Sequence, residues 1–317
     1  MEKAFCPIFI VGSSRSGTTM VNRILGNSSD VTALNELHYL GHIWDTTLPS
    51  TTLSREKALA SAAILLKHIR RGLWGGDASN AEISCAQSII SKGTTWTHRD
   101  IYQQVLTHEM NGSSRFVTDQ TPRNVFFVTE ILELFPQAKI IHMIRDPRAV
   151  LASQRNRWKT KWLGGGGMPL GNAFRMLANY HPYTLSKLWA ATAKIADSNR
   201  NQDRYRVVIF EQLVSRPDYE VEKICRFIGI EYRHEMLAVP QIGSSNKLHA
   251  TDKIGVTSDV IDAWKNNLPE GDVLVCEHLT RQWMKRYGYI ATGDGSWSWR
   301  ALMPALRFPF HVLKNNR

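Results

Sequence analysis

The sequence predicts an α/β fold, a central parallel β-sheet flanked by helices, on three observations. Short β-branched runs alternate along the chain with amphipathic segments of helical period, the pattern of strand–helix–strand units. The strand runs are apolar without alternation, as expected for strands covered on both faces. A glycine-rich turn follows the first run. The chain has 317 residues, 43% hydrophobic and 21% charged, an ordinary globular composition that excludes intrinsic disorder and coiled coil.

Local signals place the individual elements. Ser54 is a helix cap, and Thr97 with Asp100 forms a capping box. Asp146 and Pro147 are a cap and a first helical position. Strands are predicted where apolar and β-branched residues cluster, at 7–11, 116–117, 139–144 and 206–210. Helices are predicted at 18–26, 54–71, 97–112, 124–134, 147–158, 183–199, 217–228, 257–267 and 273–287.

The chain is predicted to form one domain, residues 1–295, followed by a basic aromatic tail, residues 296–317. The tail mixes basic and large apolar side chains and has no acidic residue. It fits packing on the domain or on a partner subunit, and it also fits peripheral contact with an anionic membrane surface. A homodimer is left open as well. The glycine-rich stretch 162–172 is either a connecting loop or a lid over a ligand.

Charge and cysteine usage narrow the partners. The 39 Lys and Arg residues exceed the 28 Asp and Glu residues, so the net charge is +11 and an anionic ligand is favoured. The basic residues are dispersed and no nucleic-acid motif is present, so we expect no nucleic acid. The four cysteines form no CxxC pair, which predicts no metal site, free thiols and a cytoplasmic protein. The short apolar run near the N-terminus predicts a first strand rather than a signal peptide.

The strongest functional signal is the turn Gly12–Thr19 (GSSRSGTT), between a predicted strand and a predicted helix. Glycines let the backbone curl so that its N–H groups point at an anion on the helix N-terminus. The spacing equals that of the nucleotide-binding P-loop, GxxxxGK[ST], and predicts a P-loop NTPase-like sheet. Thr18 stands where that loop has its lysine. The cation here is Arg15, whose guanidinium grips an oxyanion through a fixed fork of donors. The alternative is a turn that binds nothing.

A second motif follows about 130 residues later, in IIHMIRDPRAVLASQRNR (140–157). Arg145 ends a predicted strand, and Ser153 lies eight residues on, two turns into a helix. Ligands of open α/β sheets lie at the carboxyl ends of the strands, so Arg145 is a candidate ligand-binding residue. The alternative is a surface Arg–Asp pair beside a helical serine.

Together the two motifs resemble those of sulfotransferases that use 3′-phosphoadenosine 5′-phosphosulfate (PAPS) and release PAP. The RSGTT core is similar to the branch that contains the protein-tyrosine sulfotransferases and many bacterial enzymes. The resemblance implies a cofactor site of two parts and no metal. Arg145 and Ser153 form the 3′-phosphate part, and the 5′-phosphosulfate part is formed by Ser14, Arg15, Ser16, Gly17, Thr18 and Thr19.

The same resemblance implies two catalytic residues, Arg15 and Glu36, and His38 is a third candidate although the tyrosine-sulfating enzymes have an arginine at its position. Arg15 stabilises the leaving phosphate oxygen. Glu36 lies 21 residues after Arg15, where the protein-tyrosine branch has its catalytic glutamate, and takes the proton of the acceptor. The alternative for Glu36 is a strand-end carboxylate paired with an arginine. His38 faces either the same cleft or its rim. His142 lies in a predicted strand and is expected to be a satisfied core histidine.

Two further segments match the family less closely. Gln120 stands where the family often has a lysine, and Phe210 stands where it commonly has a tyrosine. We expect a PAPS-dependent sulfotransferase acting on a hydroxyl of a carbohydrate, a lipid or a small natural product. The acceptor pocket is expected from the segments 38–50, 74–95 and 159–182. The alternatives are a P-loop small-molecule kinase and a non-catalytic nucleotide-binding module.

Overall fold

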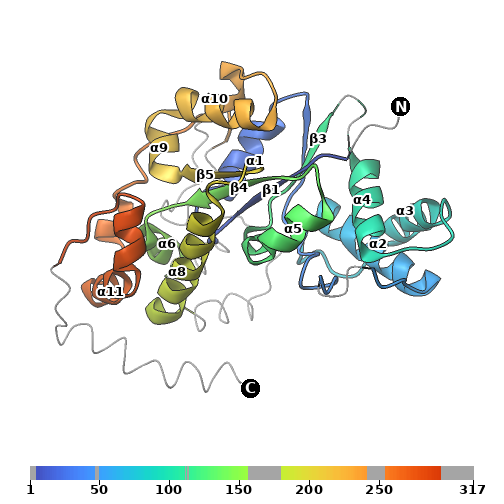
Figure 1. Cartoon of the computed structure of the whole chain (residues 1–317), viewed down its shortest axis with the longest axis horizontal. Helices are drawn as coiled ribbons and strands as arrows, with labels where there is room; N and C mark the ends of the chain where they lie inside the picture. Colours follow the sequence, from blue (N-terminus) through green and yellow to red (C-terminus); the bar gives the residue numbers. More distant parts are fainter. Residues whose placement is uncertain are drawn as a thin grey trace.

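The computed structural model describes residues 5–46, 50–110, 112, 114–155, 180–240 and 254–293. At its centre is a five-stranded sheet with the order β2-β3-β1-β4-β5 (Figure 1). Every pairing is parallel, so the carboxyl ends of all five strands share one edge of the sheet. The strands are β1 (Pro7–Gly12), β2 (Val31–Ala33), β3 (Phe116–Asp119), β4 (Lys139–Ile144) and β5 (Tyr205–Ile209).

The predicted α/β class is thereby confirmed, and most of the predicted helices are found. The α-helices are α1 (Thr18–Gly26), α2 (Arg55–Arg71), α3 (Asn80–Ile90), α4 (His98–Glu109), α5 (Val128–Leu134), α6 (Pro147–Arg155), α8 (Pro182–Asn199), α9 (Phe210–Ser215), α10 (Pro217–Ile228) and α11 (Glu270–Arg286). Short 3₁₀ helices are η1 (Pro122–Phe127), η3 (His234–Leu237) and η4 (Ala263–Asn266).

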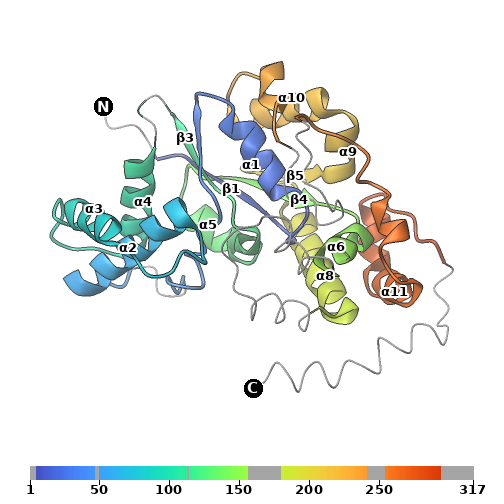
Figure 2. The same cartoon turned by 180° about the vertical axis from the view of Figure 1, so that it is seen from behind.

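Helices cover both faces of the sheet, which explains why its central strands are apolar without alternation. Every residue of β1 is buried. Phe9 and Val11 pack into one hydrophobic cluster with α2, α4 and α5, whereas Ile8 and Ile10 pack into another with α1, α9 and α10. Figures 1 and 2 show α1 and α10 on one side of the sheet and α5 and α8 on the other.

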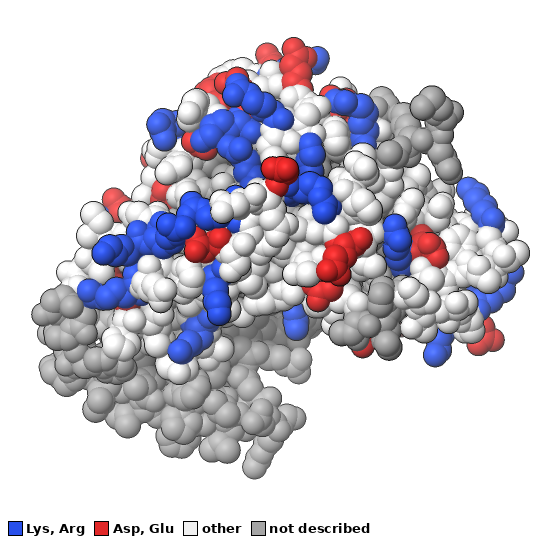
Figure 3. Space-filling view, viewed as in Figure 1, with Lys and Arg blue, Asp and Glu red and all other residues white. Residues whose placement is uncertain are grey.

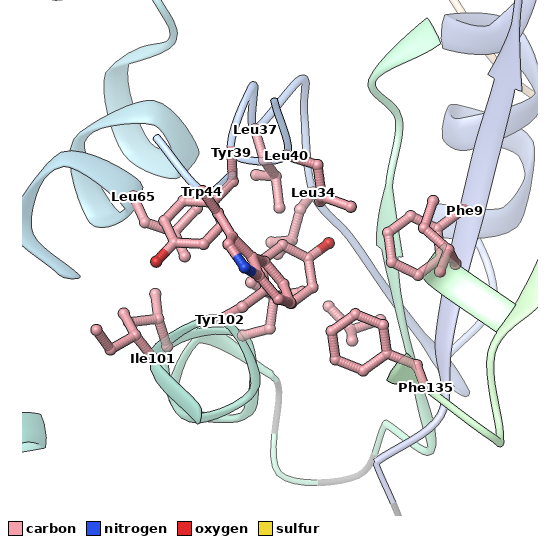
Figure 4. Packing of buried hydrophobic residues seen from close by; sticks show 14 of the residues in the cluster. Phe9, Leu34, Leu37, Tyr39, Leu40, Trp44, Leu65, Ile101, Tyr102 and Phe135 are labelled. Carbon is pink, nitrogen blue, oxygen red and sulfur yellow. The ribbon is translucent and has the colours of Figure 1, made fainter. Parts of the chain in front are cut away.

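A helical lobe of α2, α3 and α4 extends beyond the β2 edge of the sheet (Figure 1). Aromatic side chains join it to the sheet, as Figure 4 shows: the ring centroid of Tyr102 lies 5.6 Å from that of Tyr39 and 5.5 Å from that of Phe135. Trp44 is fully buried beside them. Each such side chain stabilises the fold by roughly 1.5–3 kcal/mol through burial, so the lobe and the sheet share one core.

The predicted caps are present where the sequence placed them. The hydroxyl of Ser54 accepts a hydrogen bond from the backbone N–H of Lys57 at the start of α2. Thr97 and Asp100 form the predicted capping box of α4. Gly229 ends α10 with a left-handed φ of 87°, a conformation that glycine adopts without steric cost.

Three expectations about elements were wrong, and two further α-helices and one strand were not predicted. The segment 124–134 begins as the 3₁₀ helix η1, because Pro122 starts it and Asn124 bonds Asp119 instead of a helical neighbour. The segment 257–267 contains only η4, because the hydroxyl of Thr257 accepts from a nearby backbone N–H and competes with helix formation. Phe210 starts α9 instead of ending β5. The helices α3 and α9 and the short strand β2 were not among the predicted elements.

Several predictions fall on residues outside the described ranges. These are the end of the helix at 156–158, the glycine-rich stretch 162–172, and the tail 296–317, so the division at residue 295 stays a prediction. Across the part of the chain that is described, no helix is both long and apolar enough to cross a bilayer. On the face drawn in Figure 3, basic side chains are dispersed with acidic ones between them, as the sequence predicted.

Candidate active site

Two glycines shape the turn between β1 and α1. Gly12 and Gly17 have positive φ angles of 142° and 93°. A Cβ atom at Gly12 would lie 2.4 Å from the carbonyl oxygen of Met143, and one at Gly17 would lie 2.5 Å from the ring of Phe210. Both positions therefore require glycine. Helix α1 starts at Thr18 with neither a side-chain cap nor an acidic residue in its first turn, which leaves its N–H groups to an anion.

Arg145 lies at the carboxyl end of β4, buried beside this turn. Its Nη1 donates to the carbonyl oxygen of Arg15 at 2.9 Å, and its Cζ lies 4.3 Å from the ring centroid of Phe210. Burial lowers the pKa of Arg145, while the charge of Glu211 raises it. Within the described part of the chain, Nε of Arg145 has no hydrogen-bond partner. A buried guanidinium with a donor to spare is a site for an anion.

The two sequence motifs meet through their side chains. Nε of Arg15 donates to Oγ of Ser153 at 2.9 Å, and Nε2 of Gln154 donates to the carbonyl oxygen of Ser14 at 3.4 Å. Oγ of Ser16 is buried and has no hydrogen-bond partner among the residues described. The predicted phosphate-binding residues are therefore brought together, although Arg15 and Ser153, expected at different phosphates, contact each other directly.

Helix α8 contributes two residues that the sequence did not point to. Nε1 of Trp189 donates to the carbonyl oxygen of Arg145 at 2.9 Å. The hydroxyls of Ser13 and Thr192 are 2.9 Å apart, although 179 positions separate them in the chain. Neither residue belongs to a motif, so no sequence signal could have found them. Thr19, by contrast, was predicted at the site and is exposed on α1.

Asp119, at the carboxyl end of β3, organises the next layer of the site. It is fully buried and accepts hydrogen bonds from the backbone N–H and hydroxyl of Thr121, from the hydroxyl of Tyr102 and from the amide of Asn124. Burial raises the pKa of this carboxyl, and these hydrogen bonds oppose the rise. The network fixes the turn that follows β3.

Residues 36–38 are held between that turn and α2. The hydroxyl oxygen of Thr121 accepts from the backbone N–H groups of Leu37 at 2.8 Å and of His38 at 3.2 Å. From the other side, Nδ1 of His68 donates to the carbonyl oxygen of Leu37 at 2.5 Å. Burial lowers the pKa of His68 to about 4, so its ring is neutral at pH 7. These contacts hold His38 at a φ of 49°, an uncommon conformation for a residue other than glycine.

This backbone brings the side chains of Glu36 and His38 together. Nε2 of His38 lies 2.9 Å from Oε2 of Glu36, and the two side chains are 24% and 43% exposed. The partner of Glu36 is thus a histidine, not the arginine of the alternative considered for it. Nε2 of Gln120 donates to the hydroxyl of Thr18 at 3.2 Å. Gln120 and Thr121 are adjacent, so the contact of Thr121 with residues 37 and 38 and the contact of Gln120 with Thr18 connect the Glu36–His38 pair to the turn between β1 and α1.

A buried polar network supports the end of β4 from behind. Arg148 forms ion pairs at 2.7 Å with Asp146 and with Glu277. Glu211 accepts from the backbone N–H of Asp146 at 3.0 Å and from the hydroxyl of Tyr289 at 2.7 Å. Burial raises the pKa of Glu211. Because every member has a partner, the network fixes the backbone that carries the second motif.

His142 is a core residue, as the sequence predicted, but not a fully satisfied one. Its Nδ1 bonds the hydroxyl of Tyr205, while Nε2 has no hydrogen-bond partner among the described residues. Burial lowers its pKa to about 3, so the ring is neutral. It therefore fills the sheet and takes no part in the site.

The fold is that of a P-loop-like α/β protein in which the two sequence motifs meet, and comparison with known proteins gives its family. The model of the Sulfotransferase family matches residues 7–234, so the chain belongs to this family. The match spans both motifs and every strand of the sheet.

Several curated proteins are similar to the chain. Carbohydrate sulfotransferase 3 of Tetronarce californica is 28% identical over 55% of this chain and 41% of its own length. Protein-tyrosine sulfotransferase A of Caenorhabditis elegans is 25% identical over 89% of this chain and 67% of its own length. The nodulation protein NoeE of Sinorhizobium fredii is 22% identical over 82% of this chain and 60% of its own length. The chain thus spans about two fifths to two thirds of the length of these relatives.

Solved structures support the same fold. The sulfotransferase domain of the curacin biosynthetic pathway has a TM-score of 0.57 at 18% identity, covering 91% of this chain and 99% of that domain. The sulfotransferase domain of the Synechococcus PCC 7002 olefin synthase also has a TM-score of 0.57, at 21% identity and with 91% and 97% coverage.

Proposed function

We propose that this chain transfers a sulfuryl group from PAPS to a hydroxyl acceptor and releases PAP. One observation carries the proposal: Arg145 contacts the backbone of Arg15, and Arg15 contacts Ser153. Oγ of Ser16 and Nε of Arg145 are buried donors without partners among the described residues, which fits an anionic ligand. In this proposal Arg145 and Ser153 hold the 3′-phosphate, and the turn at 14–19 holds the 5′-phosphosulfate.

The turn supplies the charge stabilisation. During sulfuryl transfer, negative charge grows on the 5′-phosphate oxygen that leaves the sulfur. Arg15, the hydroxyl of Thr18 and the first N–H groups of α1 donate to that oxygen. Because Gln120 already donates to the oxygen of Thr18, the threonine hydroxyl proton is left to point at the ligand. One donor of this kind is typically worth roughly 3–4 kcal/mol in the barrier.

Glu36 is the proposed general base. As the acceptor oxygen attacks the sulfur, its proton passes to a carboxylate oxygen of Glu36, which typically contributes about 10²–10⁴-fold. His38 donates to Oε2 of Glu36, which leaves Oε1 to take the proton. His38 thereby orients the carboxylate in this proposal.

We propose a carbohydrate, a lipid or a small natural product as the acceptor. The similarity to a carbohydrate sulfotransferase supports this class, and the similarity to protein-tyrosine sulfotransferases makes a tyrosine peptide the comparison to include. The four cysteines are free, which supports a reducing compartment such as the cytoplasm. Peripheral membrane contact through the tail and a homodimer are further proposals.

Ligand-induced thermal stabilisation tests the donor. PAP is expected to raise the melting temperature, whereas ATP with Mg²⁺ and AMP leave it nearly unchanged. Stabilisation by ATP with Mg²⁺ instead would favour a kinase, and no stabilisation by any nucleotide would contradict the proposal.

The acceptor is then sought directly. Four reactions are set up, each with the chain, PAPS and one acceptor: an oligosaccharide, a sterol, a phenol or a tyrosine peptide. Products are detected by mass spectrometry as a gain of one SO₃ in the mass of the acceptor. A product in any of the first three supports the proposed class. Sulfation of the peptide alone would contradict it.

A further inference from the structure

A second cluster of reactive side chains lies in the helical lobe, away from both phosphate motifs. Cys85 of α3 and the pair His108 and Glu109 at the end of α4 each present one ligand atom, and these three atoms lie within 4.8 Å of one another. Sγ of Cys85 is 3.2 Å from Nε2 of His108. Cys85 and Glu109 are half-buried and His108 is exposed, so the cluster is open to solvent. Because 23 positions separate Cys85 from His108, no motif spacing reveals it.

Arg70 of α2 shows that the cluster attracts a cation. Its Nη2 donates to Oε1 of Glu109 at 2.6 Å and to Sγ of Cys85 at 3.5 Å. One guanidinium nitrogen therefore contacts both the carboxylate and the sulfur. The Arg70 side chain is 35% exposed, so it can turn into solvent. The ion pair between Arg70 and Glu109 does not by itself explain why a thiol and an imidazole also lie here.

We propose that Cys85, His108 and Glu109 bind a divalent transition-metal ion of the zinc class in competition with Arg70. Thiolate, imidazole and carboxylate are the ligands that zinc prefers, and bonds of ~2.3 Å to sulfur and ~2.0 Å to nitrogen place those atoms about 3.5 Å apart in a tetrahedral site. The 3.2 Å between Sγ and Nε2 is already close to that separation. Three protein ligands leave the fourth position to water.

Binding changes the protonation and contacts of the cluster in a defined way. The metal–sulfur bond replaces the S–H bond of Cys85, whose proton goes to solvent, and His108 coordinates through its neutral Nε2. Arg70 gives up its contacts with Glu109 and Cys85. The ion then fastens α3 to α4, because Cys85 belongs to one helix and the other two ligands to the next.

The lobe so fastened is joined to the site. In α4, Tyr102 donates to the buried carboxylate of Asp119, and His98 bonds the hydroxyl of Tyr39. The metal therefore stabilises the lobe and takes no part in sulfuryl transfer. The proposal does not depend on the proposed function, and PAP binding is expected to be the same with and without the ion.

Titration calorimetry with ZnCl₂ on the tag-free, chelator-treated full chain tests the site. Wild type is expected to bind one zinc ion, and Arg70→Ala to bind it at least about fivefold more tightly because the competing cation is gone. Cys85→Ser and His108→Ala are each expected to weaken binding at least about tenfold. Cys6→Ser is the matched control, since Cys6 is also half-buried, and it should bind as wild type does. Mg²⁺ should give no heat, because it avoids thiolate and imidazole.

Co²⁺ gives a second readout that does not depend on affinity alone. Coordination by Cys85 should produce the near-ultraviolet thiolate-to-cobalt charge-transfer band in wild type and in Arg70→Ala, but not in Cys85→Ser. Two results would overturn the proposal: no zinc binding by either wild type or Arg70→Ala, or zinc binding by Cys85→Ser that equals wild type.

Discussion

The two sides of the candidate active site are built in different ways. On the proposed donor side, Ser16, Arg145 and Ser153 are at most 8% exposed and are fixed by contacts among β1, β4, α6 and α8. On the proposed acceptor side, Glu36 and His38 are 43% and 24% exposed and belong to one loop. The donor side is therefore a buried site at the carboxyl edge of the sheet, which we call the cradle. The acceptor side is a short loop that a few hydrogen bonds hold in place.

This difference teaches how one fold serves many acceptors. A buried, preorganised site suits a ligand that never changes, because its donors lose no entropy when the ligand binds. An exposed loop suits a ligand that differs from one protein to the next, since loops tolerate change while the scaffold stays fixed. The two sides should therefore respond to substitution in different ways: changes at the loop should act on turnover, and changes in the cradle on donor affinity.

The largest expected effect is on the acceptor side. Glu36→Gln keeps the shape of the side chain and removes the base, so kcat should fall by about 10²–10⁴-fold while the affinity for PAP is unchanged. Steady-state kinetics and calorimetry measure the two quantities. Glu56→Gln, at an exposed position of α2, is the control and should behave as wild type. Full turnover by Glu36→Gln would remove Glu36 from the mechanism.

The next effect belongs to the donor side. Arg145→Ala removes a buried charge that faces a phosphate in the proposed complex, which costs about 2–5 kcal/mol, or about 30- to 4,000-fold in the Kd of PAP. Arg155→Ala, at the exposed end of α6, the helix that follows Arg145 in the chain, should leave the Kd unchanged. A melting temperature measured without ligand confirms that both variants are folded. Equal affinity for PAP in Arg145→Ala and wild type would separate Arg145 from the donor site.

The donor side was the predictable part of the molecule, for physical reasons. The backbone requires glycine at positions 12 and 17, so the residue types alone predict the turn between strand and helix. Arg145 could be placed because parallel strands end at one edge of the sheet. Continuous apolar runs predicted β1 and β4 because helices cover both faces of the sheet.

The contacts of the acceptor side could not be predicted, because they join residues far apart in the chain. His68 and Thr121 belong to different elements from Leu37, and nothing in the pattern of α2 distinguishes His68 from other residues of that helix. The helix α3 is a different case. Its capping box, Ser79 with Glu82, is visible in the sequence, but the segment 74–95 was expected only as part of the acceptor pocket, and no helix was predicted there.

A pH-dependent effect sharpens the contrast between the two sides. The folded pKa of His68 is lowered to about 4, from about 6.5 in an unfolded chain, so the unfolded state binds the proton first as the pH falls. Stability should therefore decrease between pH 6.5 and pH 4, by about 2 kcal/mol at pH 5. His68→Asn keeps a donor for the carbonyl oxygen of Leu37 and cannot titrate, so it should lose about 2 kcal/mol less than wild type between pH 7.5 and pH 5.

Urea unfolding at the two pH values measures this difference. The buried His142 is present in both proteins, so its own contribution to acid destabilisation cancels in the comparison. If the free energy of unfolding falls by the same amount in both proteins, the lowered pKa of His68 does not cause the loss of stability in acid.

The smallest expected effect concerns Phe210, which packs against Arg145 and Gly17 on the donor side. The ring of Phe210 lies 4.3 Å from Cζ of Arg145 and against Gly17, so Phe210→Leu removes a cation–π contact while keeping an apolar side chain there. Such a contact is worth about 0.5–1 kcal/mol, which corresponds to about a two- to fivefold rise in the Kd of PAP with kcat unchanged. Phe116→Leu removes a similar stack on Arg115 away from the site and should not change the Kd. A fall in kcat without a change in Kd would show that this ring acts on the acceptor side. The assignment of donor affinity to the buried side and of turnover to the loop would then be wrong.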